Sequence, residues 1–165
     1  MNVRTAVAVS AVPGMSEARL AWARRSSLAV LALLVVEYGL GMYVNLYVVV
    51  PAADHGGSLG EVISEGPVML SVHATVGLLL GLVALATLVH AIRCRRWAVI
   101  ALAALGFFAV AFAAFAGAAF AGAAFTSTGD TADSMAMSVM TGVALLCYAI
   151  NLYLLGRPAR RSSEV

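Results

Sequence analysis

Four long runs of apolar residues constrain the fold of this chain more than any other feature of its sequence. The runs cover residues 27–50, 67–92, 97–125 and 135–155. Each is as long as the roughly 20 residues that an α-helix needs to cross a bilayer. In hydrocarbon, only helices and closed barrels satisfy their own backbone hydrogen bonds, and uninterrupted apolar runs of this length favour helices. The sequence therefore predicts an all-α integral membrane protein with four spans.

Short polar links join consecutive runs, so neighbouring helices are expected to be antiparallel in a four-helix bundle covering residues 26–156. Charged residues make up only 11% of the chain, where a soluble domain has about 25%, so the bilayer is the expected solvent. Residues 1–25 are predicted to be a cytoplasmic N-terminal segment, with residues 16–23 either a short amphipathic helix at the membrane surface or part of a tail. Residues 157–165 are predicted to be a cytoplasmic tail.

The distribution of arginine predicts the orientation of the bundle. All ten basic residues are arginines, and they fall before the first run, between the second and third runs, and after the fourth. The other two links contain five acids and no arginine. By the positive-inside rule, both termini and the link at 93–96 are cytoplasmic. The bias toward Arg, Ala, Gly and Val is typical of a bacterial genome rich in GC, which places the protein in the bacterial cytoplasmic membrane. Because topology explains the arginines, nucleic-acid binding is not expected.

Polar side chains interrupt the first two runs. Glu37 lies in the middle of the first run, where a charged group costs roughly 2.5–3.5 kcal/mol, and Asn45 follows it two turns later. Gly41 lies between them and leaves room for a partner. His73 lies in the second run at a depth similar to that of Asn45. These residues predict a polar intramembrane site around Glu37, Asn45 and His73.

Two interpretations of this polar site remain open. An intramembrane acid is by default a hypothesis of function. The structural alternative is that Glu37 only forms a hydrogen bond with Tyr148, Thr87 or a backbone carbonyl, and that His73 forms one with Asn45. The variant Glu37→Gln distinguishes the two roles. A purely structural role predicts that the variant changes stability alone, and a role in proton or solute movement predicts that it abolishes transport while the protein still folds.

A cofactor site is a further hypothesis. His73 is a candidate axial ligand of haem b, with Met140 or Met137 from the fourth run as the second ligand, since His/Met ligation of haem iron is common. A pair of histidines on two helices would indicate haem more specifically, and the fourth run contains no histidine.

Other site types have less support in the sequence. A copper-type site at the outer surface would draw on Asp54, His55, Met69 and His73, since imidazole and thioether suit copper. Their spacing matches no known motif, so we assign no metal ligand. No phosphate-binding loop, nucleophile elbow or zinc-binding histidine pair occurs. No catalytic residue is assigned, and an enzymatic role is not favoured.

The third run carries small residues at helical spacing. The hexapeptide FAGAAF occurs at 115–120 and again at 120–125. Gly117, Ala121 and Gly122 belong to two ridges of small residues spaced by four, which let a neighbouring helix backbone approach closely. We therefore predict that these three residues serve helix packing.

Three parts of the chain carry a resemblance to known proteins: EYGLGMYVNLYVVVP in the first run, the region 73–77, and the FAGAAF stretch followed by a methionine-rich fourth run. In these parts the chain resembles uncharacterised small four-helix integral membrane proteins of actinobacteria. No activity follows from that resemblance. The chain is also distantly similar to one half of haem A synthase, a four-helix bundle with haem-ligating histidines. This likeness implies the same fold and, at His73, a haem ligand.

Taken together, the sequence predicts a small polytopic inner-membrane protein of non-enzymatic role with a polar intramembrane site. The alternatives are a haem b-binding electron-transfer protein and a subunit of a small transporter or channel. The lipid bilayer is the expected partner, and assembly into a homo-oligomer or a larger membrane complex is left open.

Overall fold

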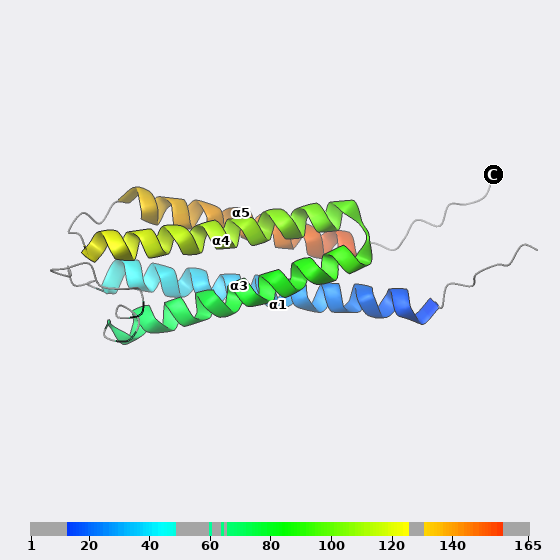
Figure 1. The fold of residues 1–165 in the computed structure, drawn as a ribbon, viewed down its shortest axis with the longest axis horizontal. Coiled ribbons are helices and arrows are strands. Elements are labelled where there is room, and N and C mark those ends of the chain that lie inside the picture. The colour runs from blue at the N-terminus through cyan, green and yellow to red at the C-terminus, as the bar shows by residue number, and fades with distance from the viewer. Residues whose placement is uncertain (1–12, 49–59, 61–63, 65, 126–130, 157–165) are drawn as a thin grey trace, which may run out of the picture.

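Four long helices make up most of the part of the chain that the structure describes. The computed structural model describes residues 13–48, 60, 64, 66–125 and 131–156, with the side chains of 13–16, 119–125 and 131–133 left out. The helices are α1 (Pro13–Tyr47), α3 (Val68–Cys94), α4 (Trp97–Phe125) and α5 (Thr131–Gly156) (Figure 1). The predicted all-α four-helix antiparallel bundle is confirmed.

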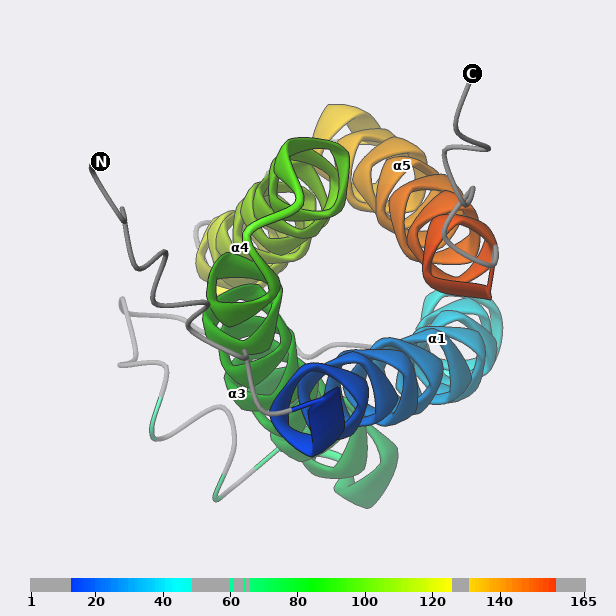
Figure 2. The same cartoon turned by 90° about the vertical axis from the view of Figure 1, so that its right-hand side faces the viewer.

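The helices form a closed ring in which each contacts two others. α1 packs on α3 and α5, and α4 packs on the same two helices, whereas the backbones of the diagonal pairs do not come close among the described residues (Figure 2). The start of α1, the link between α3 and α4, and the end of α5 lie at one end of the bundle (Figure 1). We call this the arginine end, and the opposite end the loop end. The described arginines at the arginine end are Arg19, Arg24, Arg25, Arg93, Arg95 and Arg96.

The boundaries of α3 follow from its flanking residues. Pro67, with φ −56° and ψ 136°, precedes the first turn, where its missing N–H has no partner to lose. At the other end Arg95 adopts the left-handed conformation, with φ 55°, and its N–H donates to the Ile92 carbonyl at 3.1 Å. This cap reverses the chain, so that α4 begins at Trp97.

The first helix is longer than the apolar run. α1 starts at Pro13, so the stretch 16–23 is the first part of the spanning helix and not a separate element at the surface. No glycine or proline interrupts residues 16–38, and Ala23 and Ser27 are fully buried. Helix propagation continues because tertiary contacts cover this face. Residues 49–50, expected in the same helix, lie outside the described residues.

The middle of the bundle is closed by a central apolar cluster. Its members are buried and come from all four helices: Val30, Leu34, Leu80, Ala84, Ala109, Val110, Ala144 and Tyr148. Tyr148 of α5 is the largest fully buried side chain, and its ring packs on Gly106 of α4. A Cβ at Gly106 would lie 2.7 Å from Tyr148 Cε2. The glycine therefore provides the space that the tyrosine ring occupies.

The outer surface of the bundle is apolar. Large side chains such as Val35, Leu78, Phe108 and Leu146 are 61–69% exposed. An apolar surface of this extent is unusual for a soluble monomer. All four helices are long and apolar enough to cross a membrane, over Glu17–Tyr47, Val68–Cys94, Trp97–Ala118 and Ser134–Gly156. The chain is therefore a small polytopic membrane protein.

The contact between Gly106 and Tyr148 gives a test of the packing. We expect Gly106→Ala to lower the free energy of unfolding by about 1–3 kcal/mol, because the added methyl group meets a ring that has no free space to move into. Gly81→Ala is the matched control, since no atom lies within 4 Å of a Cβ built there. It should be neutral or stabilising by up to about 1 kcal/mol through helix propensity. Unfolding in mixed detergent micelles measures both, and equal effects would contradict the packing.

Candidate functional site

Glu37 of α1 and His73 of α3 lie side by side inside the bundle and form an ion pair when the imidazole is protonated. The Glu37 Oε1 and His73 Nδ1 atoms are 3.1 Å apart, and the two side chains are 14% and 22% exposed. This is the only acid–base pair within 4 Å among the residues that the structure describes. His73 lies about 8 Å along α3 from the start of that helix, so the pair belongs to the half of the bundle nearer the loop end.

Two glycines create the space for this pair. Glu37 and Gly41 are one turn apart on α1, and His73 and Gly77 are one turn apart on α3. A Cβ at Gly77 would lie 2.7 Å from Glu37 Oε1, and a Cβ at Gly41 would lie 3.3 Å from His73 Cε1. Because the helices are antiparallel, each polar side chain lies against the glycine of the opposite helix.

The pair is not fully satisfied by hydrogen bonds. The separation of 3.1 Å is that of an ion pair, but the orientation of the two groups is not that of a hydrogen bond, and neither His73 Nδ1 nor Glu37 Oε2 has a hydrogen-bond partner among the described residues. A carboxylate and an imidazole at this distance can share a proton, because either group can carry it.

Asn45 lies apart from the pair. Its side chain is exposed, and its Oδ1 accepts a hydrogen bond from Ser134 Oγ of α5 at 3.3 Å. The structure thus brings together two of the three residues of the predicted polar site and directs the third toward another helix. The rotation of α1 explains the difference, since eight residues turn a helix by about 80° beyond two full turns.

The hydrogen-bond partners considered for Glu37 are used elsewhere or unpaired. Thr87 Oγ1 donates to the Val83 carbonyl of its own helix at 2.8 Å. Tyr148 Oη is buried in the central cluster without a hydrogen-bond partner among the described residues. Glu37 therefore lies against His73, an arrangement that the sequence did not predict although it singled out both residues.

The candidate haem ligands make separate contacts. Met137 lies on α5 with its sulfur against Gly117 of α4, where a Cβ would be 2.9 Å from Sδ. Met140, also on α5, packs on the central cluster. His73 is on α3, which does not contact α5 among the described residues. The imidazole is directed toward α1, so these residues as arranged do not fit a His/Met haem site.

The predicted packing residues are partly described. Gly117 provides space for the Met137 side chain, whereas Ala121 and Gly122 lie within α4 at positions whose side chains are outside the described residues. Asp54 and His55, considered as metal ligands, also lie outside them. Among the described residues no group of three or more His, Cys, Asp or Glu side chains is placed to hold a metal ion.

A second buried polar contact was missed by sequence reasoning. Asn151 of α5 donates from Nδ2 to Ser27 Oγ of α1 at 3.4 Å, and both residues are fully buried. Asn151 Oδ1 has no hydrogen-bond partner among the described residues. Asn151 lies close to the end of the fourth run, and α1, which begins at Pro13, covers it.

Comparison of the chain with protein-family models, curated proteins and solved structures finds no match to any of them. The resemblances to actinobacterial four-helix proteins and to haem A synthase therefore stay predictions. The geometry of the bundle alone carries the functional argument.

A double-mutant cycle tests the energetic coupling of the pair. We expect Glu37→Ala and His73→Ala to be non-additive in the free energy of unfolding by about 0.5–3 kcal/mol, because each single variant leaves a buried polar partner unpaired. The control cycle combines Asn45→Ala with His73→Ala. Since Asn45 contacts Ser134, that pair should be additive to within about 0.5 kcal/mol. Additivity in both cycles would contradict the pairing.

Proposed function

We propose that this protein is a small, non-enzymatic membrane protein in which the Glu37–His73 pair takes up and releases a proton within the bilayer. One observation carries the proposal: a carboxyl group and an imidazole from different helices lie 3.1 Å apart in spans that are predominantly apolar. Ionisable residues inside membranes are costly and commonly mark proton or ion pathways.

The remaining polar groups of the interior support this role. Along α1, the Glu37–His73 pair and the buried Ser27–Asn151 contact follow one another from the loop end toward the arginine end, and the exposed Asn45–Ser134 contact lies nearer the loop end. Glu37 Oε2, Tyr148 Oη and Asn151 Oδ1 are buried without hydrogen-bond partners among the described residues. Such atoms are the usual binding points for internal water.

The central apolar cluster separates the pair from the arginine end. Val30 and Leu34 lie on α1 between Ser27 and Glu37, and both are fully buried. The pair lies on the loop-end side of this layer, so exchange of its proton with the loop end would not have to cross the central cluster. Movement of a proton past this layer would require that Tyr148 and its neighbours shift.

We also propose the orientation and location that the arginines predict. The arginine end would be cytoplasmic and the loop end would face outward, in the cytoplasmic membrane of a bacterium. Six described arginines at one end, against the single described acid Glu17 there, support this orientation. The Glu37–His73 pair then receives its proton from the outer side.

Infrared difference spectroscopy during a pH step tests the proposed proton site. We expect a carboxyl C=O band that changes with pH in the wild-type protein and is absent in Glu37→Gln, since the amide has no titratable proton. His73→Gln should shift the band, because removal of the imidazole changes the electrostatic surroundings of the carboxyl group. A wild-type protein without any band dependent on Glu37 would contradict the proposal.

Proton flux in liposomes provides the functional readout. We expect Glu37→Gln to lower proton uptake at the outward-facing surface while the thermal stability in detergent stays within about 1 kcal/mol of wild type, because the amide replaces the carboxyl group without loss of volume. Asn45→Asp is the control for a new acid that lies outside the pair. If Glu37→Gln changed stability alone, the pair would be structural.

A further inference from the structure

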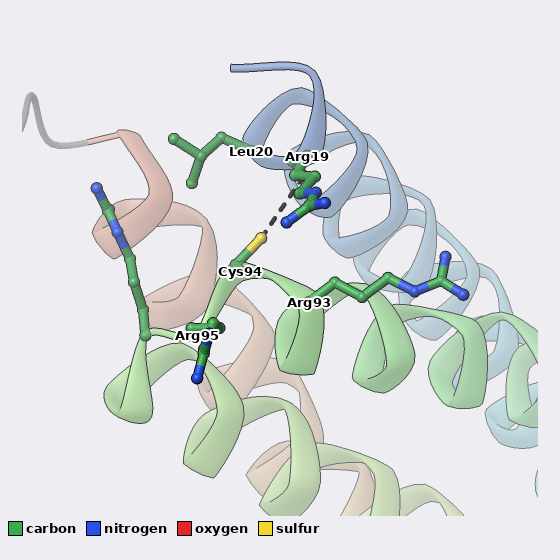
Figure 3. Close-up of a pocket in the computed structure, with 6 residues that line it drawn as sticks. Arg19, Leu20, Arg93, Cys94 and Arg95 are labelled. Atoms are coloured by element: carbon green, nitrogen blue, oxygen red, sulfur yellow. Dashed lines mark hydrogen bonds between the residues drawn. The ribbon is translucent and has the colours of Figure 1, made fainter. Parts of the chain in front are cut away.

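A pocket lies at the arginine end, where three helices meet. It has a volume of about 240 Å³ and is partly open. Its lining residues come from α1 and from the turn between α3 and α4: Arg19, Leu20, Arg93, Cys94, Arg95 and Arg96. Figure 3 shows Arg19 and Leu20 on α1 next to Cys94, with Arg95 on the other side of the thiol and Arg93 directed along α3. The proposed proton site is elsewhere, in the other half of the bundle.

The backbone on both sides of the pocket is held in place. Cys94 Sγ donates a hydrogen bond to the Arg19 carbonyl at 3.6 Å, which ties the end of α3 to the first part of α1. Arg95 closes α3 through its N–H bond to the Ile92 carbonyl. The arginine side chains therefore project from fixed positions on two different elements.

The positive charge of the pocket has no counter-charge within 4 Å among the described residues. None of its four guanidinium groups has an ion-pair or hydrogen-bond partner among the described residues. The single described acid at this end, Glu17, is exposed and makes no ion pair among those residues. Guanidinium groups that line one pocket without counter-charges favour an anionic ligand, and phosphate matches their fork of N–H donors.

The surroundings of the pocket are those of a membrane interface. One turn further into the bundle, Trp22 of α1 stacks on His90 of α3 with ring centroids 6.1 Å apart, and the Arg25 guanidinium lies 6.0 Å from the Trp22 ring. Trp97, at the start of α4, is 83% exposed. Tryptophan is enriched at the level of lipid headgroups, so the pocket lies at the depth where lipid phosphates are found.

We propose that this pocket binds the phosphate of an anionic phospholipid headgroup. Arg19 and Arg96 would provide charge-assisted hydrogen bonds to the phosphate oxygens, and Leu20 with the adjacent apolar helix surface would contact the upper part of the acyl chains. Basic pockets between spanning helices are known to hold anionic headgroups. A soluble phosphate compound shares this chemistry, and the experiment separates the two sources.

Native mass spectrometry of the full chain in a neutral detergent tests the proposal. We expect phosphatidylglycerol to be retained in preference to phosphatidylcholine, and Arg19→Gln/Arg96→Gln to weaken this retention at least roughly tenfold, because each arginine loses charge-assisted bonds. Arg24→Gln/Arg25→Gln is the matched control, with the same loss of charge at the same end of the bundle but outside the pocket. Equal retention of both lipids, or equal loss in both double variants, would overturn the proposal.

Cys94 reports on occupancy without any arginine change. In a Cys147→Ala background, the rate of maleimide labelling should fall when phosphatidylglycerol is added and stay unchanged with phosphatidylcholine, because the headgroup covers the thiol. The labelling rate tests the lipid proposal even if Arg19→Gln/Arg96→Gln fails to fold. Protection by inorganic phosphate or pyrophosphate, with none from phosphatidylglycerol, would assign the pocket to a soluble ligand and overturn the lipid proposal.

Discussion

Close approach of helix backbones over glycine is the constraint on which the rest of this structure depends. Between helices in a bilayer no hydrophobic driving force remains, so packing must come from complementary shapes. The bundle meets this requirement by placing a large side chain against a glycine of the next helix. Tyr148 lies on Gly106, and Met137 lies on Gly117. Both contacts belong to one antiparallel register of α4 and α5. Tyr148 and Met137 are as far apart along α5 as Gly106 and Gly117 are along α4, and the two helices run in opposite directions.

The same rule positions the polar pair between α1 and α3. Glu37 occupies the space over Gly77, and His73 occupies the space over Gly41. Glu37 and Gly41 are as far apart along α1 as Gly77 and His73 are along α3, and the two helices run in opposite directions. A single antiparallel register therefore fixes both contacts. Packing and electrostatics are therefore inseparable here, because the glycines that let the helices approach also bring the carboxylate within 3.1 Å of the imidazole.

The two ends of the bundle differ in their chemistry. The half toward the loop end holds the Glu37–His73 pair, whereas the arginine end holds a pocket whose guanidinium groups form no ion pair with the described residues. Between them the central cluster with Tyr148 is apolar. Such a layer separates the two sites, so that proton binding at one and anion binding at the other would influence each other only through movement of the helices.

The sequence by itself determined the number of helices, their antiparallel order and their membrane character, because the length and hydropathy of each run are local properties. It also identified Glu37 and His73 as unusual, and Gly41 as space for a partner. The spacing of four between Glu37 and Gly41, repeated by His73 and Gly77, was the signal that could have predicted the pair.

Only the tertiary structure decided which polar groups meet. The rotation of each helix about its axis and its register against its neighbours depend on side chains from other helices, which no single run contains. This is why Asn45 is directed to Ser134, why Asn151 meets Ser27, and why the extension of α1 to Pro13 was not apparent from hydropathy. The arginines were explained by topology alone, and their arrangement around a pocket depends on the turn at Arg95 and on its contact with α1.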